Sequence, residues 1–395
     1  MPAPTPSPSE LLAQAQSLRE RFPDWLTNRN PNAAQAGRES PLLPVLLKQL
    51  YPDFERPWSN DAYPVAVFPA PPSQVSQPDS VLGTLTQEQV KPDPHLTAAG
   101  QKYVELLQAR SSYLHDSATY SLVEMKLGQT IKLDCALGRY FDAVRTCDAL
   151  EWELLASLAA NRLSGDPRDA LKQLKLRGRV HALSESPMTR PVGRNSALAI
   201  STTVIFRGPD GFSVMAQRRA AESPSVHAGT WHVVPSGMFQ PVADDKLKEF
   251  SVTHGFYREY LEELFRAPEA PRKPSGIRHD YFYDNPNLAY LQSLLSKGSA
   301  AHLFTGMAIS LMNFRAEICT LLFIDSPEWY EKHNVGAGGL SRLGLNEDEW
   351  QAGMSVQPLS WVHDGSPAPT DSVPPGAASL WLAVETARRM GLLKY

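Results

Sequence analysis

The sequence predicts an α/β fold in two regions, which meet near residues 184–195. Three observations carry this prediction. Beyond residue 195, short apolar runs bounded by Gly, Pro and Asp alternate with helical patterns, as strands and helices do in an α/β domain. Before residue 184, helical periodicity dominates, and one pair of short runs around Gly128 has the pattern of a hairpin. Ser, Pro, Gly and Arg residues cluster in the boundary segment 184–195, as is typical of a segment that connects two regions.

Composition places the chain among globular proteins. Its 395 residues are 42% apolar and 20% charged, and a chain of this length can bury a sizeable core. The net charge is −4 and no long basic block occurs, which argues against nonspecific binding to nucleic acid. No apolar run reaches the roughly 20 residues of a membrane-spanning helix, so no membrane partner is expected.

The start of the chain and the cysteines bear on the cellular compartment. Residues 1–8 lack the basic start and apolar core of a signal peptide, so the cytoplasm is the default expectation. Cys135, Cys147 and Cys319 are odd in number and have no Cys-x-x-Cys spacing, so neither a disulfide framework nor a zinc site is indicated. All three are expected to be small buried hydrophobic residues.

The first region is expected to hold a tail and one α+β domain. Residues 1–8 are rich in Pro and Ser and are expected to be disordered, because they have nothing to bury. Residues 9–190 are expected to form the α+β domain, whose role the sequence does not reveal, and residues 52–94, with many prolines, an irregular segment within it. The expected helices and hairpin are helices at 9–22, 42–50, 97–109, 141–161 and 166–176, and strands at 120–127 and 130–133.

The second region, residues 191–395, is expected to be rich in strands. A turn at Gly208-Pro209-Asp210-Gly211 joins two strand patterns and predicts a hairpin. The expected elements in order are strands at 197–206, 212–217 and 231–234, a helix at 250–265, a buried strand at 318–324 and a closing helix at 377–390.

The helix at 250–265 carries Arg258-Glu259-Tyr260-Leu261-Glu262-Glu263. Positions i, i+3 and i+4 share one face of a helix, so the three glutamates should project together. Their oxygens are hard ligands of the kind that suits Mg²⁺ or Mn²⁺, which in turn bind phosphate oxygens. Taken alone, the pattern is more typical of a solvated acidic face, which is common on surface helices.

This segment, with Pro235-Ser236-Gly237 upstream, resembles the second half of the signature of the Nudix family. That signature reads Gly-x5-Glu-x7-Arg-Glu-U-x-Glu-Glu-x-Gly-U, where U is aliphatic, and the resemblance extends over roughly residues 197–395. It implies an α/β/α sandwich with a mixed sheet, and metal-dependent cleavage of a diphosphate linkage in a nucleoside diphosphate derivative. It also implies that Glu259, Glu262 and Glu263 hold Mg²⁺ or Mn²⁺ and that Glu262, Glu263 and Arg258 take part in catalysis, with Arg258 orienting the carboxylates.

The first half of the signature departs from the family. Position 243, where the family has glutamate, is Ala243, and 20 residues separate Gly237 from Arg258 where the family has 13. An inserted loop is tolerated because the entropic penalty of loop closure grows slowly with length. Glu249 is a candidate for the missing glutamate, in competition with Asp244 and Asp245.

The end of the helix also departs from the family. Phe265 stands where the family has the glycine that turns the chain off the helix, so Pro268 and Pro271 are expected to help end it.

Three further positions are candidates for the site. Arg218 or Arg219 follows the second hairpin strand, where Nudix enzymes often place an arginine, and either could bind substrate phosphate. A solvated strand end is equally consistent with these arginines. Gly237 would let the backbone approach the metal site. Many Nudix enzymes draw a further acidic ligand or general base from the region before the later apolar strand, and the resemblance makes Glu317 the first candidate for it and Glu249 the second. A surface carboxylate is the alternative for Glu317.

The preferred hypothesis is therefore a metal-dependent Nudix-type hydrolase whose partner is a small-molecule nucleotide. An alternative is a catalytically weak module of the same fold that binds a nucleotide metabolite as a sensor or regulator. A third hypothesis is an interaction protein in which the acidic helix is only a surface. A homodimer is left open, and the identity of the substrate cannot be inferred from these motifs.

Overall fold

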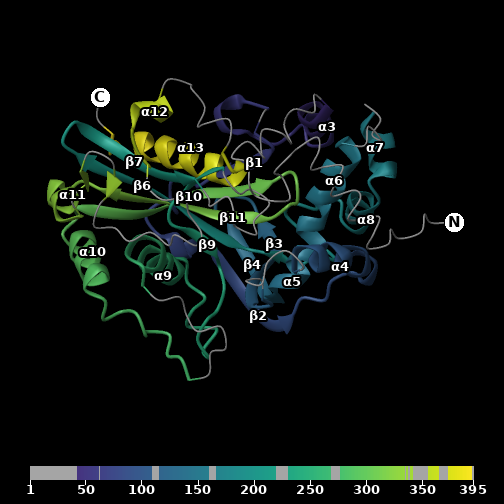
Figure 1. Cartoon of the computed structure of the whole chain (residues 1–395), viewed down its shortest axis with the longest axis horizontal. Helices are drawn as coiled ribbons and strands as arrows, with labels where there is room; N and C mark the ends of the chain where they lie inside the picture. The colour runs from purple at the N-terminus through teal and green to yellow at the C-terminus, as the bar shows by residue number, and fades with distance from the viewer. Residues whose placement is uncertain are drawn as a thin grey trace.

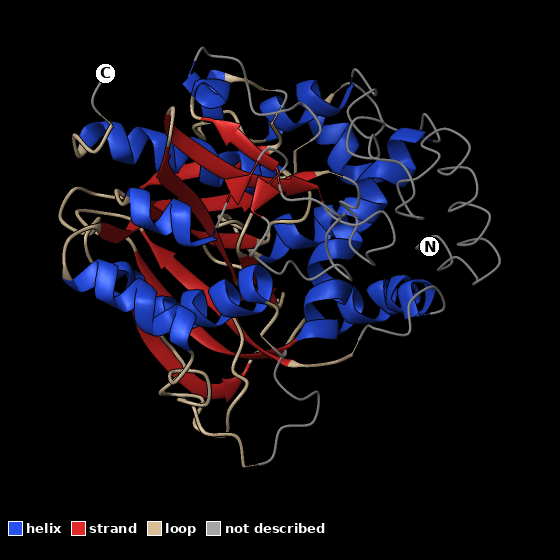
Figure 2. Ribbon diagram, turned by 60° about the vertical axis from the view of Figure 1, so that its left-hand side comes forward, coloured by secondary structure: helices blue, strands red, loops and turns tan. Residues whose placement is uncertain are grey.

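The computed structural model of the chain describes residues 42–61, 63–108, 115–159, 166–218, 230–267, 276–333, 335–336, 339–340, 355–363 and 372–393. Within them, two mixed β-sheets are packed with helices, which confirms the predicted mixture of α and β structure (Figures 1 and 2). A third sheet has only two short strands, β12 (Val335–Gly336) and β13 (Gly339–Leu340). None of the helices in these ranges is long and apolar enough to cross a membrane.

The larger sheet has eight strands and combines parallel and antiparallel pairs. Strands β6 and β11 run parallel at its centre, and the other pairs are antiparallel. Its main path is β1 (Val65–Pro69), β10 (Ala300–Ser310), β11 (Ala316–Ile324), β6 (Ala199–Gly208), β7 (Gly211–Arg218) and β14 (Ser355–Pro358), with β8 (Trp231–Val233) on β7 and β9 (Ser236–Met238) on β6. Most residues of β10 and β11 are buried, because helices cover both faces of the sheet.

Helices lie on both faces of the larger sheet (Figure 1). On one face are α9 (Val252–Phe265), α10 (Pro286–Ser296) and α11 (Pro327–His333), which share a hydrophobic cluster with strands β6 and β11. On the other is α13 (Pro374–Arg389), preceded by the short α12 (Ser360–His363). Helix α13 buries Leu380, Leu382 and Val384 among other residues, so this closing helix belongs to the core.

The smaller sheet combines three strands that precede residue 190 with one strand that follows it. Its order is β2 (Leu82–Gln89), β4 (Lys132–Arg139), β3 (Ala118–Lys126) and β5 (Ser196–Ala197). The β3–β4 pairing confirms the predicted hairpin, with Lys126 opposite Lys132. The surrounding helices are α3 (Leu42–Leu50), α4 (Pro94–Gln108), α5 (Tyr140–Ala143), α6 (Ala149–Ala159), α7 (Pro167–Gln173) and α8 (Lys175–Leu183).

The prediction that residues 52–94 are irregular is wrong at two strands. Strand β1 pairs with β10 from Val65 to Pro69, and β2 pairs with β4. The prolines do not interrupt these strands: Pro69 is the last residue of β1, β2 contains no proline, and Pro78 opens the 3-10 turn η2 (Pro78–Val81) before β2. Proline is tolerated at such positions because no ladder hydrogen bond is lost there.

The predicted boundary at residues 190 and 191 does not separate two cores. Strand β1, from the first half, extends the larger sheet, while β5, from the second half, extends the smaller one. A single hydrophobic cluster includes Leu43, Leu133 and Leu380. The two halves therefore depend on each other for burial. The expected tail at 1–8 and helix at 9–22 lie outside the described residues.

Two predicted helices are divided. The helix expected at 141–161 contains a π turn, Val144–Asp148, where Gly100 of α4 approaches so closely that a β-carbon there would lie 2.0 Å from the carbonyl oxygen of Arg145. The helix expected at 166–176 ends at Gln173, and α8 follows from Lys175.

Candidate functional site

Helix α9 carries the predicted carboxylates and begins two residues later than the sequence predicts. Ser251 is its N-cap, with the side-chain oxygen accepting a hydrogen bond from the backbone N–H of His254 at 3.1 Å. The helix ends at Phe265 because Arg266 adopts a left-handed conformation with φ of 50°, and the Ala267 N–H bonds to the Leu261 carbonyl at 3.1 Å. The left-handed conformation of Arg266 therefore ends the helix, a role that the sequence had suggested for two prolines. Pro268 and Pro271 lie outside the described residues.

Gly237 leaves space for the carboxylate of Glu259. Gly237 lies on β9, opposite Ile200 of β6. A β-carbon at position 237 would lie 2.2 Å from Oε2 of Glu259, well inside contact distance. Only glycine therefore accommodates this side-chain position, which gives a physical reason for the glycine that the sequence motif contains.

Arg258 is almost fully buried and joins the helix to the strand before it. Its guanidinium donates to the carbonyl oxygens of Gln240 at 2.9 Å and Met238 at 3.1 Å, and to Oε1 of Glu259 at 2.9 Å. Its Nε lies 4.0 Å from Oε2 of Glu262. Burial lowers the pKa of Arg258, but the charges of Glu259 and Glu262 outweigh burial and raise it, so the guanidinium stays charged.

The other two glutamates of α9 point to different neighbours. Oε2 of Glu263 accepts a hydrogen bond from the Ser236 N–H at 3.2 Å, so this carboxylate reaches back to β9. Oε1 of Glu262 lies 3.5 Å from the hydroxyl of Tyr281. Glu259 and Glu262 are partly open to solvent, with exposed fractions of 12% and 15%, whereas Glu263 is buried.

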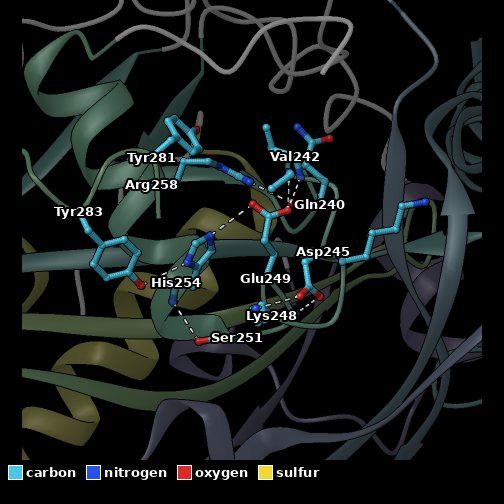
Figure 3. A network of polar contacts seen from close by, with 12 residues as sticks. Gln240, Val242, Asp245, Lys248, Glu249, Ser251, His254, Arg258, Tyr281 and Tyr283 are labelled. Atoms are coloured by element: carbon cyan, nitrogen blue, oxygen red, sulfur yellow. Dashed lines mark hydrogen bonds and ion pairs between the residues drawn. The ribbon is translucent and has the colours of Figure 1, made fainter. Parts of the chain in front are cut away.

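Glu249, the candidate for the missing signature glutamate, holds the loop before α9 (Figure 3). Its Oε2 accepts from the N–H groups of Val242 at 2.6 Å and Ala243 at 2.7 Å, and its Oε1 lies 3.5 Å from Nε2 of His254. Burial raises the pKa of Glu249, but His254 and the two N–H groups overcome burial and hold the pKa below its usual value. This carboxylate therefore fastens residues 242 and 243 to the start of the helix.

Asp244 and Asp245, which competed with Glu249, are exposed on the loop. Asp244 accepts from the Gly276 N–H at 3.0 Å and Asp245 from the Lys248 N–H at 3.2 Å. Asp245 therefore stabilises a turn within the loop, whereas Asp244 joins the loop to the segment that begins at Gly276.

Strand register places Glu317 on the face of the sheet away from α9. Ile200 pairs with Ile318, and its Cδ1 atom lies 2.8 Å from the β-carbon position of Gly255 in α9. Side chains alternate along a strand, so Glu317, one residue before Ile318, faces the other side. There its carboxylate accepts a hydrogen bond from Ser201. The structure therefore does not bring Glu317 to the carboxylates of α9.

The predicted arginines of the hairpin are only partly covered by the structure. The backbone of Arg218 pairs with Trp231 at the end of β7. Arg219 lies outside the described residues. Their predicted contact with substrate phosphate stays a prediction.

Tyr281 and Tyr283, which sequence reasoning missed, belong to the surroundings of the site together with His254. His254 Nδ1 lies 3.2 Å from the Tyr283 hydroxyl, and Tyr281 adjoins Glu262. The signal available in the sequence was the aromatic run Tyr281-Phe282-Tyr283, 19 residues beyond Glu262. Only the fold brings that run back to α9.

The donor set suits a divalent cation in its chemistry. Glu259 and Glu262 offer carboxylate oxygens at partly exposed positions, and Gly237 provides the space in which the Glu259 carboxylate lies. Mg²⁺ and Mn²⁺ prefer such oxygens. Within the described part of the chain, however, no three His, Cys, Asp or Glu side chains converge as a preformed metal site. Glu259, Glu262 and Glu263 are therefore not arranged as a preformed site of three carboxylates.

Comparison with known proteins adds no family assignment: no model of a known protein family matches the sequence, and no curated protein matches it.

Proposed function

We propose that the protein is a metal-dependent hydrolase of the Nudix type, which cleaves a diphosphate linkage in a nucleoside diphosphate derivative. The observation that supports this most is the close approach of Gly237 to Glu259, together with the buried guanidinium of Arg258 behind that carboxylate. A solvated acidic face would need neither the glycine nor a buried counter-charge. The mixed sheet between helices agrees with the α/β/α sandwich implied by the sequence motif.

In this proposal the residues of α9 have separate tasks. Glu259, Glu262 and Glu263 would hold Mg²⁺ or Mn²⁺, and Arg258 would orient Glu259 and offset the repulsion between the carboxylates. A bound divalent cation would neutralise charge on the diphosphate and acidify a water molecule. The substrate would be an anionic small-molecule nucleotide, since the cation supplies the positive charge that the net negative chain lacks.

A second candidate is a catalytically weak module that binds a nucleotide as a sensor or regulator. Two observations favour it. The three carboxylates of α9 do not converge in the described structure, and Glu317, the candidate general base, lies on the other face of the sheet. Such a protein would bind a nucleotide with a cation and turn it over slowly or not at all.

One experiment separates the two candidates. Turnover of ADP-ribose, NADH, nucleotide sugars, dinucleoside polyphosphates and nucleoside triphosphates is measured with Mg²⁺ or Mn²⁺ for the wild type, Glu262→Gln and Glu263→Gln. The matched control is Glu385→Gln on α13, whose carboxylate pairs with Arg388 far along the chain from α9. A hydrolase should lose about 100-fold or more in kcat/KM in the two α9 variants and nothing in the control.

Two outcomes would change the conclusion. If both α9 variants turn over a substrate as fast as the wild type, the proposed metal site is wrong. If the wild type hydrolyses nothing but binds a nucleotide in a titration with Mn²⁺, the sensor is the better account.

A further inference from the structure

The loop before α9, residues 239–250, here called the inserted loop, is held by side chains from the first half of the chain. The hydroxyl of Tyr120, on β3, donates to the carbonyl of Lys246 at 2.5 Å, and the backbone N–H of Tyr120 donates to the carbonyl of Phe239 at 3.1 Å. Ser117 donates to the side-chain oxygen of Gln240 at 3.1 Å. The inserted loop is thus bonded at both ends to a region that the sequence motif does not include.

Aromatic packing reinforces these hydrogen bonds. The ring of Tyr120 lies 4.7 Å from that of Phe239 and 5.0 Å from that of Phe250, measured between centroids, and these two phenylalanines stand at the two ends of the inserted loop. Tyr120 is fully buried, and burial, followed by the charge of Glu249, raises the pKa of its phenol, which therefore stays protonated and able to donate.

The start of α9 is held in the same way by Asp79, which lies in the 3-10 turn η2. Its Oδ1 accepts from the Ser251 hydroxyl at 3.0 Å and from the Thr253 N–H at 3.2 Å. Helix α9 has no acidic residue in its own first turn. Asp79, 172 residues before Ser251, therefore supplies a second hydrogen-bond acceptor beside the Ser251 cap, and the negative charge that a helix N-terminus favours.

These contacts lead to the carboxylates through Arg258. The two carbonyls that fix its guanidinium belong to Met238, the last residue of β9, and Gln240, near the start of the inserted loop. The same guanidinium binds Glu259. A movement of the loop or a rotation of α9 would break at least one of these bonds. The orientation of Glu259 therefore depends on residues that hold the loop and the helix start.

We propose that Asp79 and Tyr120 are positioning residues for the carboxylate helix, and that the first half of the chain completes the site by fixing the inserted loop and the start of α9. The consequences for metal binding and turnover rest on the proposed function, whereas the consequences for the order of the loop do not.

The test uses full-length variants of Asp79 with a matched helix cap elsewhere. Asp79→Ala removes the acceptor, and Asp79→Asn keeps a side-chain oxygen that can accept both bonds. Asp166→Ala is the control, because Asp166 caps α7 by accepting from the N–H groups of Arg168 and Asp169. Hydrogen exchange of the backbone amides of residues 240–256 and Mn²⁺ affinity, from electron paramagnetic resonance of free Mn²⁺, are measured for each protein.

Asp79→Ala should speed exchange of the 240–256 amides and weaken Mn²⁺ binding about tenfold, as expected for loss of a group that orients a ligand. Asp79→Asn should keep most of the wild-type amide protection and Mn²⁺ affinity. Asp166→Ala should change neither the exchange of the 240–256 amides nor the Mn²⁺ affinity. Tyr120→Phe, which removes the hydroxyl alone, should speed exchange in the inserted loop.

Equal exchange at residues 240–256 in Asp79→Ala and Asp166→Ala would overturn the positioning role. Faster exchange with unchanged Mn²⁺ affinity would show that Asp79 holds the loop but does not position the carboxylates of α9, which would overturn that part of the proposal. A wild type that binds no Mn²⁺ would instead contradict the proposed function, and the exchange data would still decide whether Asp79 and Tyr120 hold the loop.

Discussion

The carboxylate of Glu259 lies where a side chain on Gly237 would otherwise be, 2.2 Å from the position of a β-carbon. The atoms in the way are the flexible end of one glutamate, with no backbone atom among them. A substitution at position 237 should therefore move Glu259 without disturbing the sheet. This contact allows the position of one proposed ligand to be tested separately from the stability of the fold.

Gly237→Ala should weaken Mn²⁺ binding by about 10- to 100-fold while it changes the free energy of unfolding by less than about 1 kcal/mol. The methyl group would push the Glu259 carboxylate from its place beside β9. Gly208→Ala is the control, because a β-carbon there would meet its nearest atom at an ordinary 3.5 Å. Isothermal titration with Mn²⁺ and urea denaturation give the two quantities, and unchanged affinity in Gly237→Ala would contradict this role of the glycine.

Arg258→Met should destabilise the protein by about 3 kcal/mol at pH 7, because it leaves a poorly solvated Glu259 without its counter-charge and two carbonyls without a donor. Arg258→Lys should lose less, since it keeps the charge but not the geometry of the guanidinium. Arg388→Met is the control: its pair with Glu385 is far more exposed, so its loss should cost less than about 1 kcal/mol. Equal destabilisation of both Met variants in urea would refute the structural role of Arg258.

Glu249→Gln should lower the free energy of unfolding at neutral pH. It should also make the free energy of unfolding depend less on pH in the acid range. The folded-state pKa of Glu249 lies below its ordinary value, so its contribution is present above the unfolded pKa of about 4.3 and is lost as the pH falls through the folded pKa. The loss at pH 7 should be about 1–3 kcal/mol, as for a buried hydrogen-bonded group. Urea denaturation from pH 7 to pH 3 measures it, and a constant difference between variant and wild type would contradict the depressed pKa.

Glu151→Gln should change the pH dependence of stability in the direction opposite to that of Glu249→Gln. Burial, and then the charge of Asp148, raises the pKa of Glu151 to about 8, although Asn313 donates to its carboxylate at 2.9 Å. The unfolded chain loses this proton at about pH 4.3, whereas the folded chain keeps it until about pH 8. The free energy of unfolding of the wild type therefore falls as the pH rises between these two values.

The stability of Glu151→Gln relative to wild type should therefore increase with pH, by up to about 1.4 kcal/mol per pH unit in that window. The same denaturation series measures it, with Glu385→Gln as an exposed control. A difference that falls or stays flat between pH 5 and pH 8 would show that Glu151 is ionised in the folded protein.

Local sequence patterns predicted the elements whose signals are local. The apolar run of α3 was predicted with its observed bounds, Leu42–Leu50, and α9 was predicted within two residues at its start. Strand β1 was missed because its five residues lie among prolines and gain stability from pairing with β10, more than 230 residues later. Strand β10 and helix α10 were not predicted, although together they span much of 286–310.

The site divides in the same manner. Helical spacing predicted that Glu259, Glu262 and Glu263 lie on one side of α9. The structure adds that Glu259 and Glu263 lie against β9 and that Glu262 lies beside Tyr281. Helical spacing could not predict which face of the sheet Glu317 occupies. Successive side chains of a strand point to opposite faces, and the register of β11 with β6 decides which of them point toward α9. Nor could helical spacing predict Asp79 and Tyr120, whose contacts with the inserted loop and α9 span more than 120 residues of sequence.

A metal site on α9 is tested by the binding of Mn²⁺ to wild type, Glu259→Gln, Glu262→Gln, Glu263→Gln and the control Glu385→Gln, followed by electron paramagnetic resonance without any nucleotide. Wild type and control should bind Mn²⁺ alike, and each α9 variant should bind it at least about tenfold more weakly. Absence of binding to the wild type at millimolar Mn²⁺, or equal binding by all five proteins, would contradict a metal site on this helix.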